Sequence, residues 1–515
     1  MKNPFAILTI VAALASAPVA PAAPYHKTSA AVGYKCLINH ELLIVCGQKT
    51  NSPQYIASFV EKLKGTDVDA VMCCPTMWRA NLFPSEVDPT WKRYRPDQPP
   101  SKFRSYDYIM RYLHAGGDPV KDTLEACRKC GKDFFISYRM NDHHYVTDLE
   151  WPSHNAIWRE HPEYWLGDSE TSPYTRKDNV RLFNYMRPEV RDYYFAILRE
   201  LCTKYDVDGV ELDFQRFPKF FRTDETAEGA RVMTAFVRRI REMIDRIGDE
   251  RGKSLKLCVR VPETLAKCEA AGLDVPGWDA AGLTDMINIS SFYNHTMELD
   301  IEGFRAKARR ARIYGEMNYV TFQHPKDKFA RRYTTPEIYR ASALNLFHRG
   351  ADGLSLFNYD YVPEKLRVPM AEVLKRIADV AFLKTQPKDY VISSGFGTFP
   401  ATNEKTFDVV ISDDTTSGQF VRAVLRVETR ASCADLRVGV WLNGKALQPC
   451  EHDGTELFPP LAQNAAYPAR EMLKFFAVPL ELLKGGSNRV EVKRLVQGKA
   501  ACQFRSVEIA LYARH

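Results

Sequence analysis

Eight short apolar segments, spread over the first 360 residues, constrain the fold more than any other feature of this chain. Each is bounded by turn or charged residues and is followed by a stretch with the periodicity of an amphipathic helix. Such an alternation is typical of parallel βαβ units. The apolar segments are residues 41–46, 67–75, 133–138, 207–214, 255–261, 285–290, 312–316 and 352–357.

The count of eight predicts an α/β protein whose residues 36–384 form a (β/α)8 TIM barrel. An open, doubly wound sheet is the alternative for the same alternation. After residue 384 the pattern changes to short strand-like segments separated by turns, including the hairpin signal Asn443-Gly444. We therefore expect a C-terminal all-β sandwich, jelly-roll-like, as an accessory domain over residues 389–515.

The N-terminus has the layout of a secretory signal peptide. Lys2 precedes an apolar run over residues 5–15, and small residues and prolines follow as far as Ala22. The run is too short to span a bilayer, and no later stretch is long and apolar enough either. The sequence predicts that residues 1–22 are a signal peptide and that the protein is secreted or periplasmic, with no membrane partner.

Composition and motifs argue against several other classes of protein. The formal net charge is +7 over 515 residues, and no lysine or arginine run predicts a nucleic-acid partner. Cys127 and Cys130 have C-x-x-C spacing but lie in a predicted helix with no second pair. Asp142, His143 and His144 could bind a metal, although adjacent histidines in one loop rarely chelate one ion. We expect neither a metal nor a cofactor, and the sequence leaves the oligomeric state open.

Carboxyl groups lie where a TIM barrel builds its active site, at the C-terminal ends of the strands. Asp213 ends the fourth predicted strand, Glu316 ends the seventh, and Glu263 follows the fifth. Sugar chemistry uses two such groups, one for proton transfer and one as nucleophile or base. We predict these three as the catalytic candidates. Glu211 shares a strand face with Asp213 but lies deeper, which favours a structural role.

Further polar and aromatic residues follow the same strand ends and are predicted to bind a carbohydrate. The arginines among them, together with Lys49, point to an acidic sugar such as a uronate or a sulfated sugar. The long loop after the third strand adds three tryptophans that could stack on sugar rings. The predicted substrate-binding residues are Arg139, Asn141, Asp142, His143, His144, Arg216, Arg260, Tyr293, Asn318, Asn358 and Asp360.

Each catalytic candidate also has a purely structural interpretation. Asp213 could be an ion-pair partner of Arg216 or Arg260 that only stiffens the barrel. Glu316 could cap a loop, and Glu263 could be an acidic residue in the first turn of a helix. The sequence does not choose between Glu316 and Glu263 as the partner of Asp213.

Four motifs resemble the glycoside-hydrolase-like barrels called glycosyl hydrolase-like family 10. They are YDVDGVELDFQRFP at residues 205–218, SYRMNDHH at 137–144, HPEYWLGD at 161–168 and RPEVRDYYFAILRE at 187–200. The resemblance covers most of the barrel and does not extend to the C-terminal module. It implies a secreted TIM barrel that acts on polysaccharide, and it indicates the class of activity better than the substrate.

The wider groups of glycosidases imply two arrangements of the catalytic pair. Retaining glycosidases place the acid/base after strand four and the nucleophile after strand seven, where Asp213 and Glu316 lie, but this chain lacks the Asn-Glu pair expected on strand four. In α-glycosidases a nucleophilic aspartate ends strand four, which makes Glu263 the candidate acid. The expected function is hydrolysis of O-glycosidic bonds in a poly- or oligosaccharide. The alternatives are a non-catalytic carbohydrate-binding protein and a polysaccharide lyase.

Overall fold

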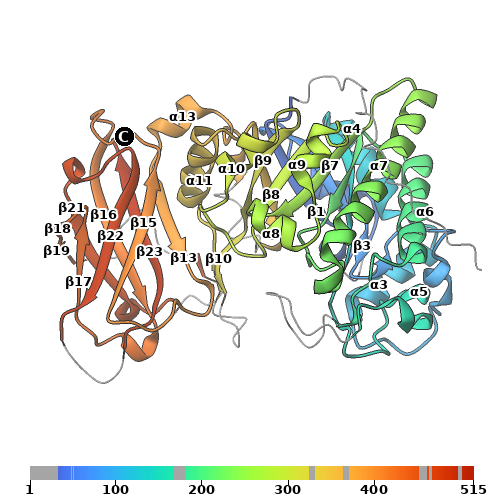
Figure 1. The fold of residues 1–515 in the computed structure, drawn as a ribbon, viewed down its shortest axis with the longest axis horizontal. Helices are drawn as coiled ribbons and strands as arrows, with labels where there is room; N and C mark the ends of the chain where they lie inside the picture. Colours follow the sequence, from blue (N-terminus) through green and yellow to red (C-terminus); the bar gives the residue numbers. More distant parts are fainter. Residues whose placement is uncertain are drawn as a thin grey trace, which may run out of the picture.

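The structure is a computed structural model that describes residues 33–47, 49, 51–167, 180–323, 331–362, 371–451, 461–462, 467–496 and 501–514. The predicted signal peptide, residues 1–22, lies outside the described residues. Figure 1 shows a barrel surrounded by helices and, beside it, an all-β body that contains the C-terminus.

Eight parallel strands close into a barrel, which confirms the predicted TIM-barrel fold and excludes an open sheet. The strands pair in the order β1-β12-β9-β8-β7-β6-β5-β2. Most are continuous apolar runs because helices cover the outside of the barrel and side chains fill its interior. The strands are β1 (Cys36–Glu41), β2 (Val68–Cys74), β5 (Asp133–Arg139), β6 (Gly209–Asp213), β7 (Lys256–Pro262), β8 (Met286–Ser290), β9 (Arg312–Asn318) and β12 (Gly353–Phe357).

The first strand lies earlier in the chain than predicted. The apolar run at residues 41–46 is not a strand, because Leu42–Val45 forms the short helix α1. The strand is the preceding segment β1, whose end carries the buried polar residues Asn39, His40 and Glu41. These side chains interrupt the apolar pattern that marks the other strands, so the prediction was wrong here.

The barrel helices begin and end at residues suited to cap them. Helix α4 (Pro119–Cys130) is typical: the Asp118 side chain accepts the backbone N–H of Lys121 at 3.1 Å, and Gly131 ends the helix with φ 65°. The longer helices around the barrel are α2 (Pro53–Glu61), α3 (Arg104–His114), α4, α6 (Pro188–Lys204), α7 (Thr226–Glu250) and α11 (Pro336–His348). Shorter ones are α5 (Ala156–Glu160), α8 (Leu265–Ala270), α9 (Val275–Ala280), α10 (Ile301–Lys307) and α13 (Val380–Thr385).

Two antiparallel sheets follow the barrel and pack face to face, as predicted for a β-sandwich. One sheet contains β13 (Lys388–Ser393), β23 (Phe504–Ala513), β16 (Phe420–Thr429), β21 (Leu473–Val478) and β19 (Gln448–Pro449). The other contains β15 (Glu404–Ile411), β22 (Gly486–Arg494), β17 (Val438–Leu442) and β18 (Lys445–Ala446). The predicted turn joins β17 to β18, with φ 50° at Asn443 and 83° at Gly444.

A small sheet joins the barrel to the sandwich. Strands β10 (Val320–Gln323) and β11 (Arg331–Tyr333) follow β9 of the barrel, and they pair with β14 (Gly395–Phe396) and β20 (Leu461–Ala462) in the order β14-β10-β11-β20. Helix α11 of the barrel also packs against β13 of the sandwich (Figure 1). Shared backbone hydrogen bonds therefore fix one domain on the other.

Buried ion pairs lie at the same junction, and those of Arg332 cross it. Arg332 donates to Glu428 at 2.6 Å and to Glu508 at 2.8 Å, and Arg426 donates to Asp389 at 2.5 Å and to Glu508. All five side chains are at most 4% exposed. Burial raises the pKa of Asp389 to about 7; Glu508 adds to this shift and Arg426 opposes it.

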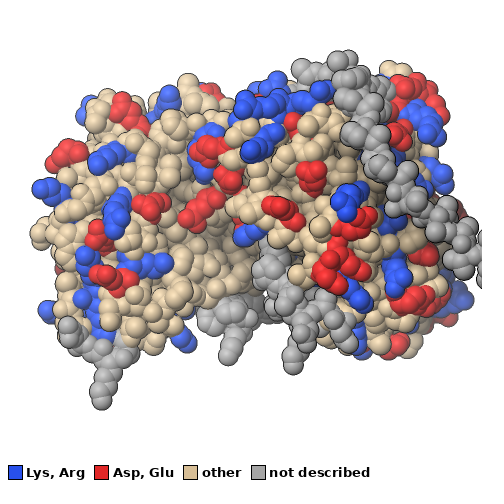
Figure 2. Space-filling model, in the orientation of Figure 1, with Lys and Arg blue, Asp and Glu red and all other residues tan. Residues whose placement is uncertain are grey.

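The surface has mixed charge. On the face seen in Figure 2, basic and acidic side chains are interspersed over both domains, in keeping with the small net charge. Within the described ranges, no helix has the length and apolar character needed to cross a membrane.

Candidate active site

A pocket of about 420 Å³ lies at the C-terminal ends of the barrel strands, where TIM barrels carry their active sites. A larger cavity, about 550 Å³, lies between α11, α13 and the sandwich, away from the strand ends. We take the strand-end pocket as the candidate site because it combines aromatic walls with cationic side chains. It is lined by Leu43, Ile44, Gly47, Trp78, Phe103, Ser105, Arg139, His144, Tyr145, Arg216, Tyr293 and Tyr361.

Three aromatic residues of this pocket have a strained backbone. Trp78, Tyr145 and Tyr293 have φ values of 55°, 56° and 68°. A left-handed conformation costs a bulky L-residue roughly 1–2 kcal/mol, so it persists only where the surroundings enforce it. Only two other non-glycine residues of the described chain have positive φ, Asn358 at the end of β12 and Asn443 in the sandwich hairpin. The concentration of strain around one pocket favours a functional role for its aromatic wall.

Arg216 supplies a positive charge to the pocket. Its side chain is nearly buried, with 7% exposed, and in the described part of the chain no carboxylate lies within ion-pair distance of it. Four aromatic rings surround its guanidinium, with centroids 5.3–5.9 Å away: Phe217, Phe292, Tyr293 and Phe357. A poorly hydrated cation without a carboxylate partner attracts an anionic ligand.

Arg139, the second cation of the pocket, is held by carboxylates on two sides. It donates to Glu41 at the end of β1 and to Asp142 at 3.3 Å. Burial alone would lower the pKa of Arg139, but Glu41 and Asp142 raise it well above its usual value. His40, next to Glu41 in the chain, pairs with Asp360 at 3.0 Å. This pair connects the end of β1 to the segment that follows β12.

Asp142 orients His144, which lines the pocket. One carboxylate oxygen, Oδ1, accepts both the backbone N–H of His144 and its ring Nδ1, each at 2.7 Å. Burial lowers the pKa of His144, and Arg216 and Arg139 add to the shift while Asp142 opposes it. Burial alone would raise the pKa of Asp142, but His144, Arg139 and Arg79 hold it below its usual range. His144 is therefore a neutral imidazole at pH 7, fixed by a charged carboxylate.

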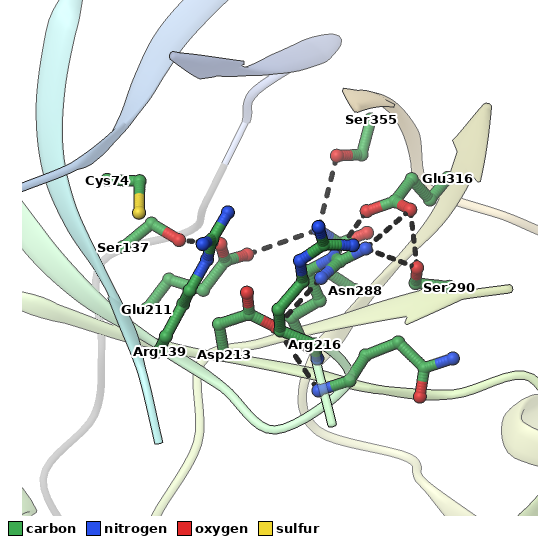
Figure 3. Close-up of polar contacts among 12 residues, drawn as sticks. Cys74, Ser137, Arg139, Glu211, Asp213, Arg216, Asn288, Ser290, Glu316 and Ser355 are labelled. Carbon is green, nitrogen blue, oxygen red and sulfur yellow. Dashed lines mark hydrogen bonds and ion pairs between the residues drawn. The ribbon is translucent and has the colours of Figure 1, made fainter. Parts of the chain in front are cut away.

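Asp213 and Glu316 meet at a third arginine, Arg260. Its Nη1 donates to Asp213 at 2.8 Å, while its Nε and Nη2 bind the two oxygens of Glu316 at 2.5 and 2.9 Å. Glu316 also accepts hydrogen bonds from Ser290 (Figure 3) and Asn318. All three charged side chains are at most 3% exposed. The structure thus brings together two of the predicted catalytic carboxylates, with one guanidinium between them.

The turn after β6 connects Asp213 to the pocket. Asp213 Oδ1 accepts the backbone N–H groups of Gln215 and Arg216 at 3.1 and 3.2 Å. The carboxylate therefore fixes the turn that presents the Arg216 side chain to the pocket.

Glu211 lies deeper in the barrel, as its position on the strand predicts. It accepts hydrogen bonds from Ser137 at 2.7 Å and from Asn288 at 3.1 Å, and Asn288 also donates to Ser355 (Figure 3). Burial, followed by the charge of Asp213, raises the pKa of Glu211. It is 1% exposed, so its polar contacts are to the barrel interior.

Some of the other predicted residues lie outside the pocket and contact neighbouring loops and helices instead. Glu263 is not among the pocket-lining residues; it forms an ion pair with Lys267 one turn along α8, and its Oε2 has no hydrogen-bond partner among the described residues. Asn141 donates to the backbone oxygens of Phe183 and Lys219 and so holds two loops together.

Of the remaining predicted residues, His143 packs against Phe217 with 3.6 Å between ring centroids and the rings tilted, and Tyr293 lines the pocket. Asn318 donates to Glu316, and Asn358 is buried with φ 56°.

The sequence prediction missed two residues that line the pocket, Tyr145 and Tyr361, and two at the end of β1 that support it, His40 and Glu41. Glu41 and His40 were overlooked because the first strand was placed too late, and a correct placement would have put both at a strand end. Tyr145 and Tyr361 belong to no motif, and their positions after strand-end loops were the only signal.

Comparisons with known proteins give no family assignment. No family model matches the chain, and no curated protein matches it. The resemblance to glycosyl hydrolase-like family 10 is therefore not confirmed.

Among solved structures, the glycoside hydrolase domain of PgaB (BpsB) from Bordetella bronchiseptica matches with a TM-score of 0.44 and 11% identity, over 67% of this chain and 98% of that chain. A maltogenic alpha-amylase, AmyB, from Thermotoga neapolitana matches with a TM-score of 0.42 and 13% identity, over 90% of this chain and 100% of that chain. An alpha-L-fucosidase from Paenibacillus thiaminolyticus matches with a TM-score of 0.36 and 11% identity, over 90% of this chain and 97% of that chain. These three structures are of glycoside hydrolases, but similarities this weak assign no function to this chain.

Proposed function

We propose that this protein is a glycoside hydrolase that cleaves O-glycosidic bonds in an acidic poly- or oligosaccharide. The observation that carries the proposal is the turn after β6. There, a buried carboxylate, Asp213, accepts the backbone N–H of Arg216, the pocket cation that has no carboxylate partner among the described residues. A nucleophile or base and an anion-binding group thus lie within three residues of each other at a barrel strand end. Membership of glycosyl hydrolase-like family 10 is part of this proposal.

The roles of the carboxylates follow from their partners. Asp213 accepts hydrogen bonds from Arg260 and from the backbone of the turn after β6, and we assign it as the nucleophile or base. Glu316 has both oxygens bound by Arg260, so we assign it to the positioning of that arginine. Glu263 keeps one oxygen without a partner among the described residues, but it lies outside the pocket and pairs with Lys267, so these contacts do not assign the proton donor.

The test is hydrolysis by Asp213→Asn. We expect the wild-type protein to release reducing ends from uronate-containing or sulfated oligosaccharides, and the variant to lose on the order of 10³-fold or more in kcat. Circular dichroism should show that the variant folds. Asp224→Asn, an exposed carboxylate outside the pocket, is the control and should retain full activity. Near-normal turnover by Asp213→Asn would sink the assignment.

A polysaccharide lyase is the second candidate, because of what lines the pocket. The lining residues include Arg139, Arg216 and His144, whose ring is oriented by Asp142. Among the described residues that line the pocket, none carries a carboxylate. In a lyase, an arginine neutralises the uronate carboxylate, and a base removes the proton on the adjacent carbon. The electron pair forms a carbon–carbon double bond, and the bond to the glycosidic oxygen breaks as that oxygen takes up a proton.

The products distinguish the two reactions. Hydrolysis in ¹⁸O-water places the label in the product, whereas elimination adds no water and gives a conjugated, ultraviolet-absorbing sugar end. Binding without either product would identify a non-catalytic carbohydrate-binding protein, the third interpretation of this chain.

Export is part of the proposal and rests on the layout of residues 1–22. Expression in a bacterial host, followed by cell fractionation and N-terminal sequencing, tests it. A mature protein that begins after Ala22 and lies outside the cytoplasm is the expected result. Retention of Met1 on a cytoplasmic protein would contradict it.

A further inference from the structure

A large aromatic side chain of the C-terminal domain contacts the wall of the barrel pocket. Phe396, in β14, stacks on Tyr293 with 5.7 Å between ring centroids and 25° between ring planes. Phe396 remains 43% exposed after this contact. We propose that Phe396 forms an outer sugar-binding subsite, so that the sandwich takes part in substrate binding; this inference rests on the proposed carbohydrate substrate.

The backbone fixes the position of Phe396. Strand β14 pairs in parallel with β10, the strand of the small sheet that follows β9 of the barrel, with Gln323 opposite Phe396. Ser393 Oγ donates to the backbone oxygen of Thr321 at 2.6 Å and accepts the backbone N–H of Gly395. Gly395 has φ 68°, and a Cβ there would lie 3.2 Å from the Asn294 side chain. The close approach of the two domains therefore depends on a glycine next to the aromatic residue.

Contacts run without a gap from the pocket cation to Phe396. The Arg216 guanidinium lies 5.5 Å from the centroid of Tyr293, and Tyr293 stacks on Phe396. The Tyr293 hydroxyl is 2.7 Å from the Tyr319 hydroxyl, which holds the ring in place. Because Arg216 and Tyr293 both line the pocket, Phe396 extends the same aromatic wall outwards. A sugar ring bound beyond the pocket could place its apolar face on Phe396.

Simple domain packing explains Phe396 less well. A residue that serves only an interface is buried by it, whereas two fifths of Phe396 is open to solvent. Other exposed apolar residues of the sandwich, such as Val421 and Leu495, are aliphatic. Such single exposed residues are common and need no function. Phe396 differs because its stacking partner is a strained residue of the candidate site.

The test compares oligosaccharides of increasing length on the full-length protein. The probes are oligogalacturonates, alginate oligomers and hyaluronan oligomers, each from dimer to hexamer, measured by calorimetry and by turnover. Phe396→Ala should weaken binding of the longest oligomers about ten-fold, the size of one aromatic stacking contact, and leave the shortest unchanged. Phe396→Trp should restore long-oligomer binding. Val421→Ala, an exposed residue of the same domain, is the matched control and should behave as wild type.

The outcomes separate this inference from the proposed activity. A length-dependent loss of binding without any turnover would support the subsite and reject the enzyme. Turnover with equal behaviour of wild type and Phe396→Ala at every length would reject the subsite and leave the enzyme standing. An equal loss at all lengths, or a lower thermal stability of Phe396→Ala, would show a structural role instead. Failure of the wild-type protein to bind any of the probes would reject both.

Discussion

Arg260 binds Glu316 through a fork: Nε donates to Oε2 at 2.5 Å and Nη2 donates to Oε1 at 2.9 Å. The pair joins β7 to β9 inside the barrel, and both side chains are at most 2% exposed. The third donor, Nη1, binds Asp213 on β6. One guanidinium thus organises the ends of three strands, which makes Glu316 a positioning residue for the carboxylate that we assign to catalysis.

Glu316→Gln should destabilise the protein strongly. Removing one partner of a buried ion pair typically costs about 3–5 kcal/mol, because the other charge remains buried with fewer partners. The measurement is the free energy of unfolding from urea titration. Glu302 forms the same kind of fork with Arg349, but its side chain is 56% exposed. Glu302→Gln is therefore the matched control, with an expected cost below about 1 kcal/mol. Equal losses for the two variants would contradict the buried-fork interpretation.

Most of the fold could be predicted because apolar runs identify strands that are covered on both faces. Seven of the eight strands coincide with the predicted segments over most of their length, whereas β1 shares only Glu41 with its segment. The eighth, β1, escaped detection because its end turns polar at Asn39, His40 and Glu41. Two of these residues have polar partners at the strand ends, since Glu41 binds Arg139 and His40 binds Asp360. A strand whose end carries polar residues of this kind therefore lacks the apolar pattern by which the other strands were predicted.

The sequence predicted which residues gather at the strand ends but not which of them neutralise one another. Asp213, Arg260 and Glu316 are 47 and 56 residues apart in the chain. Their pairing depends on side-chain directions within the closed barrel, which strand positions alone do not determine. Glu263 shows the converse case: a residue beyond a strand end, it pairs with a helix neighbour instead of joining the cluster.

Arg216→Met should weaken binding of acidic oligosaccharides by about 10- to 100-fold, the range expected for one lost hydrogen bond to a charged group. Thermal stability should be unchanged or higher, since the variant removes a nearly buried charge that has no carboxylate partner among the described residues. Calorimetric titration and thermal unfolding measure the two effects. Arg199→Met, which alters an exposed arginine beside Phe195 outside the pocket, is the control. Equal affinity of Arg216→Met and wild type for acidic ligands would remove the anion-binding role.

Asp142→Asn should lower the pKa of His144 further. The carboxylate stabilises the protonated imidazole, and its loss leaves burial and the two pocket arginines to act alone. NMR titration of the His144 ring measures this shift without any substrate. Asp148→Asn, on the same loop but paired with the exposed Lys102, should leave the His144 titration as it is. An unchanged or raised pKa of His144 in Asp142→Asn would show that Asp142 does not set its charge.

Asp389→Asn should flatten the pH dependence of stability between about pH 4 and pH 7. Asp389 has a native-state pKa of about 7, above its ordinary unfolded value near 3.9, so between these values the native state holds the proton more tightly. Stability that is present below pH 4 is therefore lost as the pH rises through 7. Asp389 faces Arg426 and Glu508, and Arg332 and Glu337 also act on it.

An asparagine stays neutral and removes only this titration, so the variant should gain stability relative to wild type as the pH rises, by up to a few kcal/mol. Urea unfolding of both proteins at matched pH values gives the difference directly and cancels the other titrating groups. Asp414→Asn, an exposed aspartate of the same domain, is the control. A difference between wild type and Asp389→Asn that stays constant from pH 4 to pH 7 would contradict the raised pKa. A difference that grows with pH would show that ionisation of the buried Asp389 destabilises the folded protein.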